Sequence, residues 1–569
     1  MLNDESLKKL SSEQRKKLAK RLEIDGQLYN VYPLSSEQMK MWYFYRLNPG
    51  LSYYNCGMHL KLLKQLDDNI LTAAFAHVIS MHEILHTIYL SVEGKIYQAV
   101  LNKDNYSIPY ENITAMPDNE EKALYINRPF KLESELPLRM MRDGEDIYVI
   151  IHHIADDGWS SGIFISSLYH VLKGNVIDQE KTPEYIDYCL WQKEYLNCSS
   201  SDQALAFWKS YFKGNPGFLN LPLDRERGTV QSFSGANKSI EIEEGLYSQL
   251  RSLSQSYGVT MFTITMALWL IAMMKLTDDE YVTIGTPAAN RLTTDKQKIF
   301  GCFVNTVAIA EKNSPNMTSI DFILKLKQNI ENVLKYQDIP FDMVVNAVDV
   351  KRSLSFSPIY QVFYSLQSKS LVGYDSSVTE NEFFRLEPIE NETVNSVQND
   401  MDILGIDNGS SIHLGITYNT AIFDGSTIEY ILENYMALVK QVVDAPNTLI
   451  RDLEWTEKKS PKHKEKISIA EPAANGSDSD KIRETIRSIW SDILKIDSFG
   501  NDVSFFDAGG NSMNCLELLE KLNSCFDIEL TIVDLFTYNS VDLSEKYISS
   551  LVSAKVQNTD SELIDNTMF

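Results

Sequence analysis

The sequence predicts a long mixed α/β region, then a linker and a small all-α module. Between Tyr32 and Trp455, strand-like runs such as YVIIHHI (148–154), YVTIGTP (281–287) and PIYQVFYSL (358–366) alternate with helical patterns. After Trp455 the composition becomes lysine-rich and then rich in Ala, Gly and Ser, which is typical of a linker. Beyond the linker, apolar residues recur at helical spacing. Alternating strands and helices favour layered α/β architecture for the first region.

The length, composition and charge of the sequence restrict the classes of protein to which it can belong. The 569 residues exceed what one core organises, so two to four domains are expected. Hydrophobic residues make up 44% and charged residues 23%, as in ordinary globular proteins. Because 53 basic residues face 78 acidic ones, the net charge is −25, which disfavours a nucleic-acid partner. The six cysteines form no CxxC pair and no His cluster accompanies them, so we expect reduced thiols and no metal site.

The pattern of residues 1–29 predicts an N-terminal helical segment that ends in a polar turn at 25–27. Such a segment either docks a partner or packs on the next domain. Its apolar positions are Leu7, Leu10, Leu18 and Leu22. It lacks the apolar stretch of a signal peptide. The most apolar run, Met261 to Met274, is too short to span a bilayer and predicts a buried helix. A cytoplasmic enzyme without a membrane partner is therefore expected.

The sharpest local pattern is IHHIADDGWSSG at 151–162. His152 and His153 leave an apolar strand, and Asp157 and Gly158 begin a turn into a helix expected to start near Ser161. Since successive strand residues face opposite sides, one histidine should face the core and the other a cleft. A histidine in a cleft suits proton transfer near neutral pH, although a histidine pair at a strand end is more often structural.

The same residues admit a second interpretation. Gly158 to Gly162 fit GxSxG, the nucleophile elbow of serine hydrolases, with Ser160 as the nucleophile. Such an enzyme needs a downstream histidine. His170 is too near and His463 lies in the predicted linker, so only His413 could serve.

The C-terminal module carries FFDAGGNSMNCLELL at 505–519. Two glycines precede Asn511 and Ser512, and a helical pattern starts directly afterwards. Taken alone, Ser512 could simply be an N-cap. The module's first helix is indicated by Ile482, Ile486, Ile489, Trp490 and Ile493, which share one helical face.

Together these motifs resemble a nonribosomal peptide synthetase condensation domain followed by a peptidyl carrier domain. HHxxxDG at 152–158 resembles the condensation core motif, and GGNS at 509–512 resembles the phosphopantetheine attachment site. Six further condensation motifs appear in order: PLSSEQMKMW (33–42), HEILHT (82–87), YIDYCLWQ (185–192), GCFVNT (301–306), YQDIPFD (336–342) and RSLSFSP (352–358). The second motif departs from the family, because Met81 and His86 stand where arginines are usual. Whatever those arginines hold together must therefore be held differently.

The resemblance implies a two-lobed, chloramphenicol-acetyltransferase-like fold with a tunnel between the lobes, plus a four-helix carrier. It implies that His153, beside His152, lies where an acceptor amine attacks a donor thioester, as a general base or a positioning group. Asp157 would form an ion pair with Arg291, and Gly158 would lie beside the reacting carbonyl. The resemblance assigns structural support of the active site to Trp159, Ser160 and Asn305, and covalent 4′-phosphopantetheine to Ser512.

The expected domains are an N-lobe (30–205), a C-lobe (206–456), a linker (457–479), a carrier (480–553) and an acidic, disordered tail (554–569). The implied partners are an upstream donor carrier, an adenylating enzyme in trans or in a neighbouring module, a phosphopantetheinyl transferase, and aminoacyl or acyl thioester substrates. Epimerisation and recruitment of another enzyme remain alternatives on the same fold, as does the serine hydrolase. Donor and acceptor identity stay open.

Overall fold

The computed structural model divides the chain into two compact units. One unit holds residues 1–225, 232–351 and 357–461, and the other holds 226–231, 352–356 and 462–569. The structure describes residues 10–552 apart from the following: 11, 25–26, 48–49, 51, 53, 93–94, 117, 176–181, 229–230, 351–352, 354, 369–375, 388–395, 457–478, 497, 504, 506–507, 509, 511, 529, 531–533, 536–537 and 550. The predicted linker, but for its last residue, and the predicted tail lie outside the described residues.

Within the described residues 12–24 and 27–32, the N-terminal part forms a helix and two paired strands, so the prediction of one helical segment over 1–29 was wrong. After α1 (Ser12–Leu18), β1 (Lys20–Ile24) pairs antiparallel with β2 (Gln27–Tyr32). These strands join β5 (Lys95–Val100) and β4 (Thr87–Val92) in the order β1-β2-β5-β4. Around Leu22 the residues alternate in exposure along β1, a period of two that the leucine spacing did not reveal.

Arg15 of α1 fixes this segment to the rest of the unit. Its Nε and Nη2 donate to Oδ1 and Oδ2 of Asp187 at 2.9 and 2.6 Å, and its Nη1 donates to Glu83 at 2.6 Å. Asp187 lies in α6 (Tyr185–Tyr195) and Glu83 in η1 (Glu83–His86), within the second motif. Arg15 thus supplies a buried guanidinium beside the motif that lacks its usual arginines.

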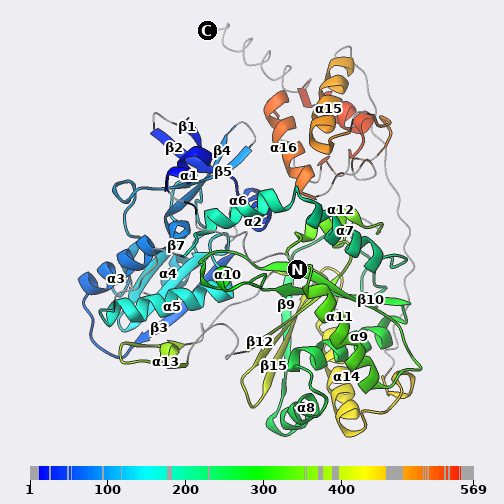
Figure 1. Ribbon diagram of the computed structural model, residues 1–569. Coiled ribbons are helices and arrows are strands. Elements are labelled where there is room, and N and C mark those ends of the chain that lie inside the picture. Colours follow the sequence, from blue (N-terminus) through cyan, green and yellow to red (C-terminus); the bar gives the residue numbers. More distant parts are fainter. Residues whose placement is uncertain are drawn as a thin grey trace, which may run out of the picture. The chain divides into compact units, whose positions relative to one another are not determined.

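A five-stranded sheet carries the histidine motif, in the order β13-β3-β8-β7-β6. Its strands are β3 (Asn55–Leu62), β6 (Tyr110–Asn112), β7 (Leu138–Asp143), β8 (Asp146–His152) and β13 (Phe384–Glu387). β8 runs antiparallel to both neighbours, with His152 opposite Asn55. β13 comes from the predicted C-lobe but pairs with β3, so the boundary at 205/206 does not separate the two lobes completely. Figure 1 shows α13 (Ser376–Thr379), the helix that precedes β13 in the chain, beside β3. Pairing between segments so far apart leaves no local trace in the sequence.

Several helices surround this sheet. They are α2 (Ser36–Leu47), α3 (Asp68–Met81), η2 (Lys103–Asn105), α4 (Asn119–Ile126), α5 (Gly158–Leu172) and α13 (Ser376–Thr379). α7 (Ser199–Tyr211) packs instead against α12 (Phe341–Ala347) in the second half of this unit. α5 packs against α3, where the rings of Phe75 and Phe164 stack with centroids 6.5 Å apart. The helix that follows the histidines is therefore anchored in a buried apolar layer.

A six-stranded sheet forms the second half of this unit, in the order β11-β10-β12-β14-β15-β9. Its strands are β9 (Gly235–Ile242), β10 (Tyr281–Ala288), β11 (Asn305–Lys312), β12 (Val362–Ser368), β14 (Met401–Asp407) and β15 (Ile412–Asn419). The accompanying helices are α8 (Glu244–Tyr257), α9 (Met261–Thr277), α10 (Thr294–Lys298), α11 (Ser319–Leu334), α12 (Phe341–Ala347), α14 (Gly425–Asp444) and η3 (Ile450–Asp452).

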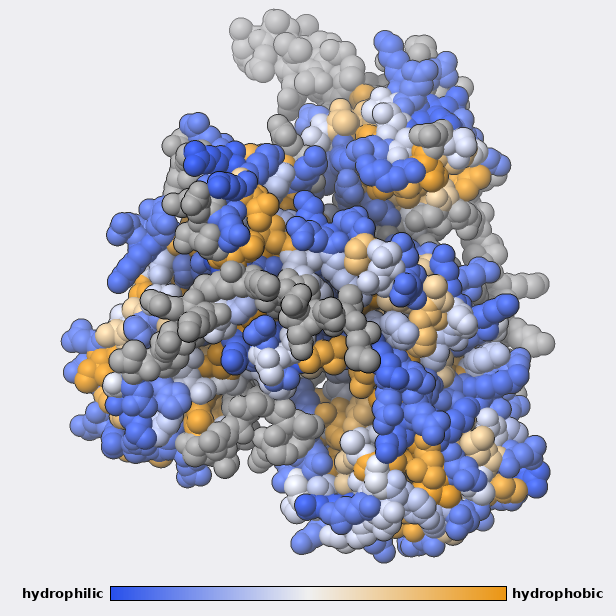
Figure 2. All heavy atoms as spheres, viewed as in Figure 1, coloured by the Kyte–Doolittle hydropathy of each residue, from blue (hydrophilic) through white to orange (hydrophobic). Residues whose placement is uncertain are grey.

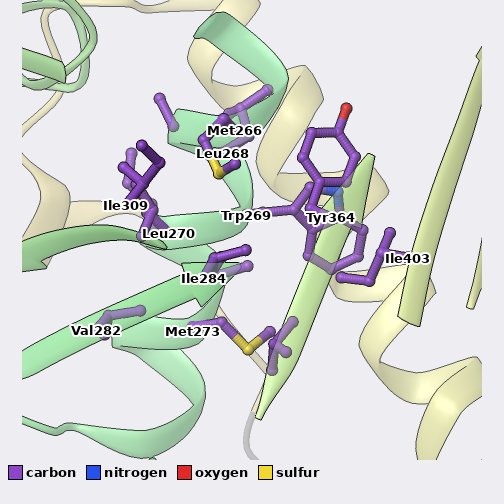
Figure 3. Packing of buried hydrophobic residues seen from close by; sticks show 14 of the residues in the cluster. Met266, Leu268, Trp269, Leu270, Met273, Val282, Ile284, Ile309, Tyr364 and Ile403 are labelled. Atoms are coloured by element: carbon purple, nitrogen blue, oxygen red, sulfur yellow. The ribbon is translucent and has the colours of Figure 1, made fainter. Parts of the chain in front are cut away.

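The prediction of a buried helix over Met261–Met274 is confirmed by α9, which packs against this sheet. Figure 3 shows Leu268, Trp269 and Met273 of α9 with Ile284 and Tyr364 of the sheet. The Trp269 ring also stacks on Tyr435 of α14, with centroids 3.9 Å apart. A helix buried on nearly every side is apolar all round, which explains the run of hydrophobic residues.

The C-terminal unit is built mainly from helices in its described part. α15 (Ser479–Leu494) buries the predicted face of Ile482, Ile486, Ile489, Trp490 and Ile493. α16 (Ser512–Phe526) adds Leu518 and Leu522 to the same core, and a further helix runs over 541–549.

On the surface, Figure 2 shows hydrophilic residues over most of the visible face, with hydrophobic residues in small groups. Among the described residues, no single helix is long and apolar enough to cross a membrane. α8 and α9 taken together pass that test, but the pair is bent by 106°.

Candidate active site at the end of strand β8

His152 is the buried member of the histidine pair, with 5% of its surface exposed. Its Nδ1 accepts the backbone N–H of Ile154 at 3.1 Å, and its ring packs edge-on against Phe130. Burial, reinforced by the neighbouring His153 and Arg139, lowers the pKa of His152 to about 3. His152 is therefore neutral at physiological pH, and its surroundings are those of a structural group.

His153 is partly exposed and follows the strand directly. One histidine of the pair is thus buried and the other is more accessible, which agrees with the prediction that they face opposite sides of the strand. Its backbone N–H donates to the carbonyl of Tyr54 at 2.7 Å. Its Nδ1 lies 2.5 Å from the carbonyl oxygen of Asp156, which can only accept. Nδ1 must then carry the proton, and a neutral His153 has its lone pair on Nε2.

Cys302 lies on the Nδ1 side of the same ring, with its Sγ at 3.8 Å. Complete burial raises the pKa of the Cys302 thiol well above its usual value, with the charges of Asp157 and Glu37 adding to the effect. The thiol therefore stays protonated and cannot form an ion pair with the imidazole.

Asp157 caps α5, which begins at Gly158 rather than near Ser161 as expected. Its Oδ1 accepts the backbone N–H of Ser160 at 2.8 Å, and Oδ2 accepts that of Phe303 at 3.0 Å. The capping bond explains the earlier start, since an N-cap carboxylate satisfies the first free N–H groups of a helix. Gly158 is exposed at the first helical position.

Arg291 pairs with Asp157, as the resemblance implied. Its Nη2 donates to Oδ1 and Oδ2 at 2.9 and 3.0 Å, and both side chains are at most 2% exposed. Nη1 donates to the carbonyls of Lys296 and Ile299 at 2.6 and 2.8 Å. The guanidinium also lies 4.2 Å from the centre of the Phe303 ring. The pair thus ties the start of α5 to the segment between β10 and β11.

Ser160 is held by backbone groups, which argues against the hydrolase interpretation. Its Oγ donates to the carbonyl of Gly301 at 2.8 Å and accepts from the Gly301 N–H and from Arg291 at 2.9 and 2.7 Å. The remaining histidine candidate, His413, lies on β15 and contacts Glu241. A nucleophilic serine needs a base within hydrogen-bond reach, and Ser160 donates its proton to a carbonyl instead.

Gly301 makes this close contact possible. Its φ is +157°, and a Cβ there would lie 2.0 Å from the ring of Tyr185. A larger residue at position 301 would clash with Tyr185 of α6, so glycine lets this backbone lie close to both α6 and Ser160.

The two other predicted support residues join neighbouring segments. Trp159 donates its indole N–H to the carbonyl of Gln297 at 2.9 Å. Asn305 donates to the carbonyls of Gln337 and Ile339 at 2.8 and 2.6 Å, and its Oδ1 accepts from Phe341. Asn305 therefore holds the segment before α12 against the start of β11.

Sequence reasoning missed Asp156, an unspecified position of HHxxxDG. Besides orienting His153 through its carbonyl, it buries a carboxyl group whose Oδ2 accepts from Ser161 Oγ at 2.7 Å. Its Oδ1 has no hydrogen-bond partner within the described part of the chain, and burial raises its pKa well above the usual value. The signal available in the sequence was an acidic residue directly after the apolar pair Ile154 and Ala155.

In the C-terminal unit, α16 begins at Ser512, whose side chain lies outside the described residues. Gly510 packs tightly before it: a Cβ there would lie 2.3 Å from Phe505, whose carbonyl accepts the Gly510 N–H at 2.8 Å. A helix start preceded by a closely packed glycine fits a phosphodiester on Ser512, because free helix N–H groups favour an anion.

Comparison with known proteins finds a matching family for the main part of each unit. Residues 29–464 match the family model of the condensation domain, and residues 484–548 match that of the phosphopantetheine attachment site. Bacitracin synthase 3 of Bacillus licheniformis is 27% identical over 427 residues, which cover 74% of this chain and 7% of that protein. The chain thus spans less than a tenth of this relative's length.

Solved structures agree on the fold. A four-domain nonribosomal peptide synthetase bound to AMP and glycine superposes with a TM-score of 0.64 at 22% identity, covering 86% of this chain and 38% of that one. The X-domain from teicoplanin biosynthesis gives a TM-score of 0.63 at 19% identity, covering 74% and 97%. The two-lobed condensation fold is confirmed, and the chain belongs to the condensation-domain family and carries a phosphopantetheine attachment domain after it, as in nonribosomal peptide synthetases.

Proposed function

We propose that the chain is an acyltransferase that forms an amide bond between a donor acyl thioester on an upstream carrier protein and an acceptor amine tethered to a carrier, with Ser512 as the attachment point of its own arm. The observation that carries this proposal is the fixed tautomer of His153. The Asp156 carbonyl holds the proton on Nδ1 and leaves a lone pair on Nε2. A lone pair so fixed can serve an attacking amine in either of two ways.

In the reaction, the amine nitrogen bonds to the acyl carbon and the carbon–sulfur bond breaks, and the sulfur that leaves as a thiolate takes up the proton lost by the amine and becomes a thiol. His153 either accepts that proton during attack or accepts a hydrogen bond that orients the amine. A thioester is already activated, so positioning supplies much of the remaining acceleration. Both roles need Nε2 unprotonated.

Asp157 and Arg291 do not act on substrate in this proposal. They hold the start of α5 against the segment at Gly301, which keeps the loop from His153 to Gly158 in one conformation. Gly158, exposed at the first helical position, offers a backbone N–H that has no intrahelical partner. We assign to it stabilisation of the charge that develops on the acyl oxygen.

Ser512 would be modified by a phosphopantetheinyl transferase with coenzyme A. When bound, the 4′-phosphopantetheine group supplies a terminal thiol that holds the acceptor as a thioester. The amino acid would be supplied by an adenylating enzyme acting in trans or in a neighbouring module. These partners follow from the carrier chemistry and remain proposals for this chain.

Two experiments test the function. Incubation with coenzyme A and a broad-specificity transferase should add one arm to the wild type and to Ser491→Ala, but none to Ser512→Ala, by intact-protein mass. A loaded donor carrier and a soluble aminoacyl thioester should then give an amide product with wild type and none with His153→Asn. Product that persists in His153→Asn would remove His153 from the proposed chemistry, whereas a wild type that forms no product would favour the recruitment alternative, in which the fold only binds another protein.

A further inference from the structure

A cavity of about 360 Å³ lies in the six-stranded half of the condensation domain, and its walls are mostly apolar. They include Phe262 of α9, Val307 of β11, Ile330 and Leu334 of α11, and Leu366 of β12. Thr286 of β10 completes them, and we call this space the Thr286 cavity. Its volume falls in the range of small-molecule sites.

The Thr286 cavity lies on the helix-covered face of the sheet. Ile284 and Ile309 point from their strands toward α9 in Figure 3. Thr286 follows Ile284 by two residues on β10, so it belongs to the same face. Its partner in the ladder, Val307, also lines the cavity.

Thr286 is the feature that distinguishes this cavity from a packing defect. It is 3% exposed, and its Oγ1 has no hydrogen-bond partner within the described part of the chain. A buried hydroxyl without a partner costs free energy. Thr265, equally buried in α9, shows the usual solution: it donates to the carbonyl of Met261 at 2.8 Å and accepts from Tyr364 at 2.7 Å.

We propose that the Thr286 cavity binds an apolar chain or ring bearing one hydrogen-bonding group, which pairs with the Thr286 hydroxyl. Leu292, 57% exposed, also lines the cavity and gives it an apolar rim. Arg291 lines it too, and the same residue holds Asp157 at the active site. A molecule in the cavity therefore touches the segment that positions the catalytic loop.

Two sources supply such a molecule. One is the acyl group or side chain of a thioester substrate, which rests on the proposed function. The other is a free small molecule that acts on the Arg291 segment. Both present the same chemistry to Thr286, and inhibition kinetics separate them.

Binding of benzyl alcohol and of ethylbenzene, which are similar in size, tests the proposal without turnover. Titration calorimetry gives the ratio of the affinity for benzyl alcohol to the affinity for ethylbenzene. This ratio should be about fivefold higher in the wild type than in Thr286→Val, because one neutral hydrogen bond contributes a factor of that size. Leu334→Trp, which fills the cavity, should lose both ligands. Thr286→Val should melt no lower than wild type, whereas the matched control Thr265→Val should melt lower because it strips Tyr364 of its acceptor.

Equal affinities for both ligands in wild type and Thr286→Val, or binding that survives Leu334→Trp, would overturn the proposal. Since these titrations need no product, they give a result even if the chain forms no amide. In the condensation assay, competition of benzyl alcohol with the acyl donor or the acceptor assigns the site to substrate, and non-competitive behaviour assigns it to an effector. Either pattern supports the proposal, and an unchanged rate at saturating benzyl alcohol would contradict both sources.

Discussion

Arg291 and Asp157 form a buried ion pair in which one guanidinium nitrogen lies 2.9 and 3.0 Å from the two carboxylate oxygens. The residues are 134 positions apart in the chain. The same nitrogen also reaches Ser160 Oγ and the Gly301 carbonyl. One side chain thus joins the helix start after the histidines to the segment between β10 and β11.

Loss of this guanidinium should be severe. Arg291→Ala leaves the Asp157 carboxylate buried without its ion-pair partner, so we expect the free energy of unfolding to fall by about 3 to 5 kcal/mol. Urea denaturation followed by circular dichroism measures this. The exposed pair of Lys238 and Glu429 is the control, and Lys238→Ala should cost less than about 1 kcal/mol. Similar losses in both variants would show that Arg291 does not hold the loop.

His153→Asn should separate chemistry from architecture. The asparagine amide can donate to the Asp156 carbonyl as Nδ1 does, but it has nothing in place of Nε2. We expect near-wild-type melting and a turnover lowered by about 10²- to 10⁴-fold, the usual contribution of a proton-transferring side chain. Turnover within a few-fold of wild type would remove His153 from the mechanism.

Glu37 should make stability depend on pH. It is 6% exposed in α2, and burial raises its pKa from 4.5 to about 7, although Gln192 donates to its carboxylate at 3.0 Å. The folded state therefore keeps a proton that the unfolded chain loses, and stability from this group falls as pH rises from about 4.5 to about 7. Glu37→Gln should abolish that loss.

The measurement is the free energy of unfolding at pH 5 and pH 8. The free energy of unfolding of Glu37→Gln should exceed that of the wild type by about 3 kcal/mol at pH 8 and by much less at pH 5. This expectation follows from the shift of the Glu37 pKa from 4.5 to about 7. A gap that stays constant with pH would mean that Glu37 ionises normally.

Arg15 should prove structural. The buried Arg15 side chain pairs with Asp187 and Glu83. Arg15→Ala should therefore lower the free energy of unfolding by about 3 kcal/mol or more. The neighbouring exposed Arg21→Ala should change it by less than about 0.5 kcal/mol. An Arg15→Ala protein as stable as wild type would return the N-terminal segment to a docking role.

The strand, turn and helix around the histidines could be predicted because their signals are local. The apolar run ending at His152 has the length of a strand, and Asp157 before Gly158 marks a helix start. The pairing of Asp157 with Arg291 came only from family resemblance, since nothing in the residues between them indicates the contact. Asp156 could not be found, because its role depends on its carbonyl and on the burial of its carboxyl group.

The N-terminal error has a physical cause. Leucines at Leu18 and Leu22 fit a helix, but Leu18 is 52% exposed and Leu22 lies in a strand of the sheet that also holds β5, about 70 residues later. Pairing over such a distance overrides local spacing. The Thr286 cavity could not be predicted for the same reason, because its walls come from five separate elements, from the segment that carries Arg291 and from Gln337 after α11.

The most direct test is a single turnover on the chain's own arm, in which Ser512 is loaded with an aminoacyl-pantetheine group and mixed with an acylated donor carrier. The account predicts that the intact mass of the wild type rises by one acyl group, while the mass of His153→Asn, loaded equally, does not change. Acyl transfer at equal rates in both proteins would contradict it.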